Sequence, residues 1–147
     1  MSADLHERVF IALGSNLGDR KKHLETAIEA VARIPLTKVI AASKIEETLP
    51  LGGMTQPKYL NQMIVASTGL DPSRFLKALH KIEEAAGRVR GERWAPRTLD
   101  LDIVRFGTRR LREADLILPH PELPNRDFWH RELEELQGTL AKLPESE

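Results

Sequence analysis

Two aspartates spaced two residues apart are the side chains of this sequence best suited to chemistry. Asp100 and Asp102 lie in the apolar stretch LDLDIV at 99–104. Side chains alternate along a strand, so both carboxylates should project from one face, with Cα atoms about 6.5–7 Å apart, while Leu101 and Ile103 face the core. Adjacent carboxylates repel each other unless cations neutralise them, and oxygen ligands favour Mg²⁺ over Zn²⁺. The alternative is an edge strand whose solvent face carries two acids.

Arginines cluster around these aspartates. Residues 88–112 contain eight arginines, no lysine and three acidic residues, which gives this segment a charge of +5. The whole chain is neutral, with 22 basic and 22 acidic residues, so the remainder carries −5. The planar guanidinium suits phosphate or carboxylate, and acids beside arginines are what a Mg-nucleotide site needs. A solvated basic loop is the alternative.

Four further features have both a functional and a structural interpretation. The glycine-bearing turn at 14–18 opens a helix but lacks the established phosphate-loop spacings, so we interpret it as a tight turn. His80 and Glu83 share one helical face and are either a surface pair or part of a site. His120 stands between prolines as a loop residue or a phosphate donor. Asn61 is an ordinary strand residue or a donor to a heterocycle edge.

Composition excludes several classes of function. The absence of cysteine rules out disulfides, thiolate metal sites and cysteine nucleophiles. The apolar runs are too short to span a bilayer, and the first residues do not resemble a signal peptide, so we expect a cytoplasmic protein. Neutral charge and only seven aromatic residues argue against nucleic-acid binding. A length of 147 residues suits a single domain over 1–147.

The elements that must position these residues follow from hydrophobic periodicity. We expect strands over 9–13, 37–48, 59–70 and 99–106, helices over 20–34 and 71–87, and loops over 49–58 and 88–98. The βαββαβ order predicts an α+β, ferredoxin-like core, an antiparallel sheet flanked by helices. Beyond Gly107 we expect a short hairpin, a proline-rich loop over 119–124 and a helix over 128–140.

Several segments together match one known pattern. They are ALGSNLG at 12–18, TLPLG at 48–52, QPKYLN at 56–61, IE at 82–83, GRVR at 87–90, RWAPRTLDLDI at 93–103, PHP at 119–121, and then Arg126 and Phe128. In this order, from about residue 9 to 128, the chain resembles the 6-hydroxymethyl-7,8-dihydropterin pyrophosphokinase family of folate biosynthesis. The segment RWAPRTLDLD is the most specific part of the match.

The resemblance implies a function and a set of site residues. It implies transfer of pyrophosphate from ATP to the pterin 6-hydroxymethyl oxygen, with release of AMP, by a monomer whose partners are ATP and a small pterin. Asp100 and Asp102 would hold two Mg²⁺ ions, and Arg88 and Arg97 would support transfer. Contacts to ATP would come from His80 (at a usual glutamine position), Glu83, Arg90, Arg93, Trp94, Ile103, His120 and Arg126. Tyr59 and Phe128 would sandwich the pterin, with Thr48, Leu51 and Asn61 along its polar edge.

The end of the chain departs from the family pattern. After Phe128 the family usually runs Val-Leu-x-Pro-Leu-x-Glu-Ile, whereas this chain has WHRELEEL. Leu133, Glu135 and Leu136 still fit, but Trp129, His130 and Glu132 do not. We therefore expect a reorganised C-terminal helix beside a retained site.

Two other classes of protein remain as alternatives. A nucleotidyltransferase also pairs a Gly-Ser turn with an Asp-x-Asp strand, but its acids follow the turn closely, whereas Asp100 lies 85 residues beyond Ser15. A ferredoxin-like RNA-binding or regulatory domain without catalysis is possible if the two acids are merely exposed. Mg-dependent ATP binding would separate the two classes, because a regulatory domain need not release AMP.

Overall fold

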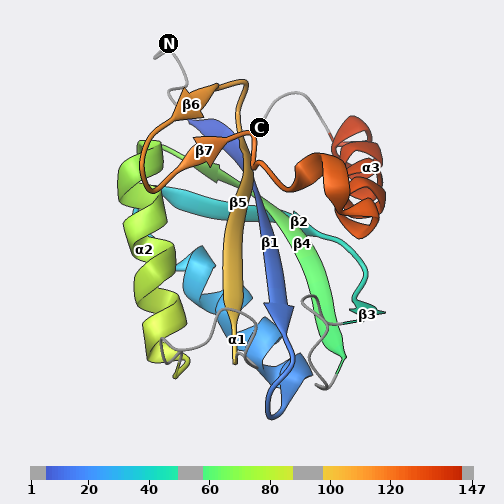
Figure 1. Ribbon diagram of the computed structural model, residues 1–147. Coiled ribbons are helices and arrows are strands. Elements are labelled where there is room, and N and C mark those ends of the chain that lie inside the picture. The colour runs from blue at the N-terminus through green and yellow to red at the C-terminus, as the bar shows by residue number, and fades with distance from the viewer. Residues whose placement is uncertain (1–5, 50–57, 88–97, 144–147) are drawn as a thin grey trace.

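An antiparallel sheet is the centre of the computed structural model, which describes residues 6–49, 58–87 and 98–143. Within these ranges five strands join in the order β2-β4-β1-β5, and β3 also pairs with β4. Figure 1 shows the long central strands β1 and β4 running side by side. The strands are β1 (Glu7–Ser15), β2 (Thr37–Ala42), β3 (Glu46–Thr48), β4 (Tyr59–Thr68) and β5 (Asp100–Phe106).

Two helices cover one face of the sheet and a third covers the other (Figure 1). α1 spans Arg20–Ala32, α2 spans Pro72–Ala85 and α3 spans Asp127–Ala141. The side chain of Asp71 caps α2 by accepting from the Arg74 N–H at 2.8 Å, and proline occupies the first turn. Gly87, with φ +90°, follows the helix in the left-handed conformation that favours glycine.

The core has two layers because successive β1 side chains point to opposite faces. Ile11 and Leu13 pack against the layer of α1 and α2. Phe10 and Ala12 pack against α3, whose Trp129 is also buried. Burial on both faces explains why residues 9–13 form an unbroken apolar run.

The α+β, ferredoxin-like prediction is confirmed, and most predicted element ends lie within two residues of the observed ones. The prediction of one strand over 37–48 is wrong, because the chain leaves the ladder at residues 43–45. A bulge in the pairing with β4 falls between Val39 and Ala41. Next, the Ser43 hydroxyl accepts from the Met63 N–H at 2.9 Å, and the Gln62 amide donates to the Ser43 carbonyl at 2.8 Å. These side-chain bonds replace the regular ladder and divide the strand into β2 and β3.

The chain after β5 forms the expected hairpin and then returns to the sheet. β6 (Leu111–Arg112) pairs with β7 (Ile117–Leu118), and a short 3-10 turn, η1 (Leu123–Asn125), leads into α3. The His120 N–H donates to the Val104 carbonyl at 2.9 Å, which ties the proline-rich loop to β5. In the described ranges, every helix is too short or too polar to cross a membrane.

Candidate active site

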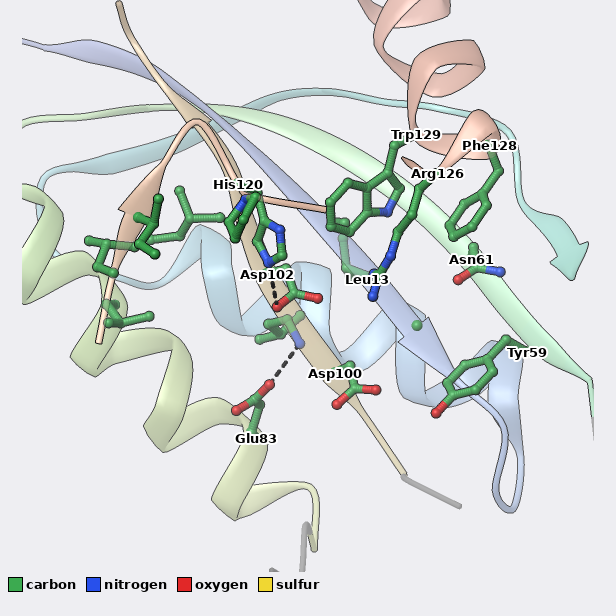
Figure 2. Close-up of a pocket in the computed structure, with 18 of the residues that line it drawn as sticks. Leu13, Tyr59, Asn61, Glu83, Asp100, Asp102, His120, Arg126, Phe128 and Trp129 are labelled. Atoms are coloured by element: carbon green, nitrogen blue, oxygen red, sulfur yellow. Dashed lines mark hydrogen bonds and ion pairs between the residues drawn. The ribbon is translucent and has the colours of Figure 1, made fainter. Parts of the chain in front are cut away.

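A pocket of about 560 Å³ lies along β5 and extends across β1 to β4 (Figure 2). Among the described strands β5 pairs only with β1, so one of its edges is open to the pocket. Helix α2, the β6–β7 hairpin and the start of α3 supply the remaining walls. The pocket therefore draws on residues from Ala12 to Trp129 in the sequence.

The two aspartates occupy the same face of β5. Asp102 pairs with Ala12 and Asp100 pairs with Gly14, while Leu101 and Ile103, which point to the other face, are buried. Small residues opposite the carboxylates leave open space above them, and the Asp102 side chain is 40% exposed. The strand is indeed an edge strand, but its acids face a pocket instead of flat, open surface.

Glu83 of α2 fixes the position of β5 through a hydrogen bond to its backbone. Its Oε2 accepts from the Leu101 N–H at 2.7 Å, and the residue is only 4% exposed. This bond satisfies a backbone donor on the free edge of β5 between the two aspartates. Glu83 is therefore no surface residue, and both it and His80 line the pocket.

His120 presents one N–H to Asp102. The Glu122 N–H donates to Nδ1 of His120 at 3.0 Å, so in the neutral ring the proton resides on Nε2. That nitrogen lies 3.6 Å from Oδ1 of Asp102 (Figure 2). The imidazole also packs edge-on against Trp129, with ring centroids 4.9 Å apart. Its orientation is thus set from two sides.

Arg126 and Trp129 form a second fixed unit beside the histidine. The guanidinium carbon of Arg126 lies 4.5 Å above the Trp129 ring, a cation–π contact. The buried Nε of Arg126 has no hydrogen-bond partner in the part of the chain that the structure describes. An anion in the pocket could accept from this guanidinium.

The opposite end of the pocket is aromatic. Figure 2 shows Asn61 between Phe128, at the start of α3, and Tyr59, at the start of β4. The Asn61 amide donates to the Thr48 hydroxyl, and Thr48 is paired with Tyr59 in the β3–β4 ladder. A flat ring could stack here against aromatic faces while its polar edge meets Asn61.

The described ranges contain no cluster of three or more histidine, aspartate or glutamate side chains placed to hold a metal ion. The two aspartates could still hold a hard cation if oxygens of a bound ligand and water completed its coordination. Phosphate oxygens would supply such ligands.

Every predicted site residue that the structure describes lines this one pocket. These residues are Thr48, Tyr59, Asn61, His80, Glu83, Asp100, Asp102, Ile103, His120, Arg126 and Phe128. The remaining predictions, Leu51, Arg88, Arg90, Arg93, Trp94 and Arg97, lie outside the described residues.

Sequence reasoning missed two parts of the wall. Trp129 departs from the family pattern and lines the pocket, and its position three residues after Arg126, which places the two on one helical face, is the signal that could have identified it. Residues 114–117 of the hairpin also line the pocket. Their residue types give no signal of a binding role.

The comparisons with known proteins agree on one family. Residues 10–138 match the model of 7,8-dihydro-6-hydroxymethylpterin-pyrophosphokinase. The chain is 40% identical to 2-amino-4-hydroxy-6-hydroxymethyldihydropteridine pyrophosphokinase of Pseudomonas aeruginosa, covering 95% of this chain and 85% of that protein. It is 38% identical to the protein of the same name from Haemophilus influenzae, with 94% and 86% covered. For the Bacillus subtilis protein of that name the identity is 39%, with 90% and 80% covered.

Proposed function

The chain belongs to the 7,8-dihydro-6-hydroxymethylpterin-pyrophosphokinase family, and from this premise we propose its reaction and the residues that perform it. It transfers the pyrophosphoryl group of ATP to the 6-hydroxymethyl oxygen of the dihydropterin, releasing AMP, in folate biosynthesis. One observation supports this most strongly: a single pocket joins an aspartate pair at one end to two aromatic rings at the other (Figure 2). Such a pocket suits a charged triphosphate beside a flat heterocycle.

The enzyme depends on Mg²⁺, with two ions held by Asp100 and Asp102. Both side chains offer only oxygen ligands, which suit Mg²⁺, and the small residues Ala12 and Gly14 pair with them across the ladder. Because the described ranges hold no cluster of three or more ligating side chains, oxygens of the bound substrate and water would complete the coordination. A Mg²⁺ ion held by Asp100 and Asp102 would neutralise the negative charge that develops on the phosphates during transfer.

The nucleotide end is completed by fixed donors. His120 presents Nε2–H beside Asp102, and Arg126 lines the pocket with a guanidinium whose Nε has no hydrogen-bond partner among the described residues, which suits it to bind a phosphate. His80 and Ile103 contribute wall surface, while Glu83 holds β5 in place. We assign ATP contacts to all five residues on this basis.

The arginine-rich residues 88–97, between α2 and β5, also act on ATP. Arg88 and Arg97 support transfer, and Arg90, Arg93 and Trp94 contact ATP, as the family resemblance implies. The connection of this segment supports the assignment, because it joins α2 to β5 and both elements line the pocket. Arginine is suited to take up charge on the transferred group.

The pterin end is selective because Asn61 has a defined orientation. Its amide nitrogen donates to Thr48, and its carbonyl, which has no hydrogen-bond partner among the described residues, can accept from the N–H groups of a pterin edge. Tyr59 and Phe128 bind the two faces of the ring, and Leu51 adds to the edge contact as the resemblance implies.

Positioning carries the chemistry. The hydroxymethyl oxygen forms a bond to the β-phosphorus as the bond between that phosphorus and the oxygen bridging to the α-phosphorus breaks; AMP leaves with the bridging oxygen, and the hydroxyl proton is released to water. No protein nucleophile is required, so the absence of cysteine has no cost for the reaction. Holding both substrates in line supplies much of the rate enhancement.

We also propose that the enzyme acts as a monomer in the cytoplasm and does not bind nucleic acid. The acids facing the pocket would repel a nucleic-acid backbone.

The function is tested by measuring AMP formed from ATP in the presence of 6-hydroxymethyl-7,8-dihydropterin and Mg²⁺. We expect pterin-dependent AMP from the intact protein and none above background from Asp100→Ala or Asp102→Ala, both still folded by circular dichroism. Glu84→Ala, which removes an exposed carboxylate of α2, is the control and should retain full activity. MgATP binding without AMP would instead favour a regulatory domain.

A further inference from the structure

Helix α3 contributes Phe128 to the pterin end of the pocket, and it also contacts the chain segment that leads into β3. Oε2 of Glu135 accepts from the Lys44 N–H at 3.0 Å. One turn earlier, Arg131 donates to Oε1 of Glu46, with its Nη2 at 2.8 Å. Residues 131 and 135 share a helical face, so α3 contacts the chain just before β3 and at its first residue.

The link that Glu135 holds, residues 43–45, lies outside the sheet ladder. Ser43 is bonded on both sides, because its N–H donates to the Met63 carbonyl at 2.8 Å and its carbonyl accepts from Gln62. Lys44 lies between the end of β2 and the start of β3, where no ladder bond serves its N–H in the described part of the sheet. The carboxylate of Glu135 fills that role.

The link leads directly to the polar edge of the pocket. β3 is three residues long and pairs only with β4 among the described strands, with Glu46 opposite Asn61 and Thr48 opposite Tyr59. Arg20 of α1 also grips this region, since its Nη1 lies 3.1 Å from Glu47 and 2.6 Å from the Lys58 carbonyl. β3 is therefore held between α1 and α3, and its last residue orients Asn61.

We propose that Glu135 is a positioning residue for pterin binding. Its bond to Lys44 sets the position of β3, β3 sets the hydroxyl of Thr48, and that hydroxyl orients the amide of Asn61. The proposal rests on the proposed function, in which Asn61 meets the pterin edge. Lys44 is exposed, so water can replace the lost bond, and removal of Glu135 should loosen the link without unfolding the protein.

The experiment compares Glu135→Ala with Glu135→Gln, which keeps an acceptor oxygen, and with Glu134→Ala, an exposed neighbour on the same helix. KM for pterin and for ATP are measured separately in the AMP assay. For Glu135→Ala we expect a pterin KM about fivefold or more above wild type and an ATP KM within about twofold, consistent with the loss of one charge-assisted hydrogen bond. Glu135→Gln and Glu134→Ala should both stay within about twofold of wild type.

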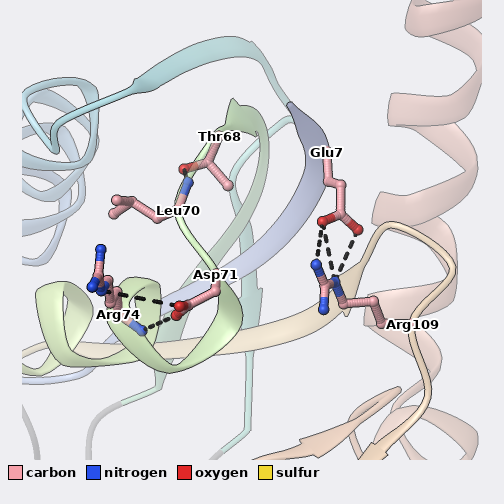
Figure 3. Close-up of polar contacts among 6 residues, drawn as sticks. All are labelled: Glu7, Thr68, Leu70, Asp71, Arg74 and Arg109. Atoms are coloured by element: carbon pink, nitrogen blue, oxygen red, sulfur yellow. Dashed lines mark hydrogen bonds and ion pairs between the residues drawn. The ribbon is translucent and has the colours of Figure 1, made fainter. Parts of the chain in front are cut away.

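Arg131→Ala provides a second, independent variant. Its matched control is Arg109→Ala, because Arg109 makes an equally short pair with Glu7, 2.8 Å, away from the pocket (Figure 3). We expect the selective rise in pterin KM from Arg131→Ala and not from Arg109→Ala. Unchanged pterin KM in both the Glu135→Ala and Arg131→Ala proteins would overturn the proposal, as would equal rises in both KM values.

This failure is distinguishable from failure of the proposed function. If the wild-type protein forms no AMP, the function itself is wrong. If the wild-type protein is active but the variants show no selective effect on pterin, only the positioning role is wrong.

Discussion

Gly14 of β1 lies at the pterin end of the pocket, where two side chains approach its backbone closely. A Cβ at this position would lie 3.3 Å from Oδ1 of Asn61 and 3.4 Å from Cδ1 of Tyr59. The glycine is therefore explained by the close approach of two proposed pterin contacts, and not by an unusual backbone angle. The positions of these two side chains therefore depend on the absence of a methyl group at residue 14.

Gly14→Ala should weaken pterin binding while the fold survives. The added methyl group must displace Asn61 or Tyr59 by a few tenths of an ångström, so we expect the pterin KM to rise about threefold or more. Gly138→Ala is the control, since its Cβ would meet nothing within 4 Å and alanine favours a helix. It should leave both KM values unchanged and stabilise the protein slightly. An unaltered pterin KM in Gly14→Ala would contradict the role given to Asn61 and Tyr59.

Glu132 is a buried acid that the proposed reaction does not use. It is 1% exposed, and neither carboxyl oxygen has a hydrogen-bond partner among the residues that the structure describes. Burial above all, together with repulsion from Glu46 and Glu135, raises the pKa of Glu132 to about 8, while the charge of Arg131 acts in the opposite direction. The side chain is therefore largely protonated in the folded protein at neutral pH.

This pKa predicts a stability that falls as pH rises. Below the unfolded pKa, about 4.3, both states are protonated and the contribution is complete. Between there and about pH 8 only the unfolded state releases the proton, so the free energy of unfolding declines by up to about 1.4 kcal/mol per pH unit. Urea unfolding at pH 5 to 8 should show a shallower decline for Glu132→Gln than for wild type. Glu134→Gln changes an exposed neighbour and is the control, so its stability should follow that of wild type. If the free energy of unfolding of Glu132→Gln fell with pH as steeply as that of wild type, Glu132 would be ionised in the folded protein.

At the scale of elements, α3 has three tasks: it covers the sheet, delivers Phe128 and Trp129 to the pocket and grips the link before β3. Sequence periodicity predicted this helix to within one residue at each end. It could not predict the break at 43–45, because that break depends on hydrogen bonds to Gln62 and Met63, about twenty residues away. Local pattern thus predicted the elements, and long-range polar contacts decided where one of them is interrupted.

Deletion of residues 138–147 tests which part of α3 the site needs. The buried Trp129, Leu133 and Leu136 remain, and only the partly buried Leu140 is lost from this cluster. We expect kcat and both KM values within about twofold of wild type, with a lower melting temperature because apolar packing is reduced. Complete loss of activity in a still-folded truncated protein would show that the last turn contributes to the site.

At the scale of the whole molecule, the pocket is assembled from both layers of the fold. Asp100 and Asp102 were predictable because strand alternation is local, and the site confirms that they share a face. The pairing of His120 with Asp102 was not predictable from spacing, because the return of the chain after the hairpin brings them together. The chain is neutral in total, yet residues 88–112 carry a charge of +5 and include the strand that bears the two aspartates.

In the proposed reaction the β- and γ-phosphoryl groups of ATP are transferred to the pterin together. Phosphorus-31 NMR of a reaction containing the protein, ATP, Mg²⁺ and 6-hydroxymethyl-7,8-dihydropterin tests it most directly, because the spectrum identifies both products. We predict equal amounts of AMP and a pterin diphosphate, formed only when the pterin and Mg²⁺ are both present. Formation of ADP with a pterin monophosphate, or no product at all, would contradict pyrophosphoryl transfer by this protein.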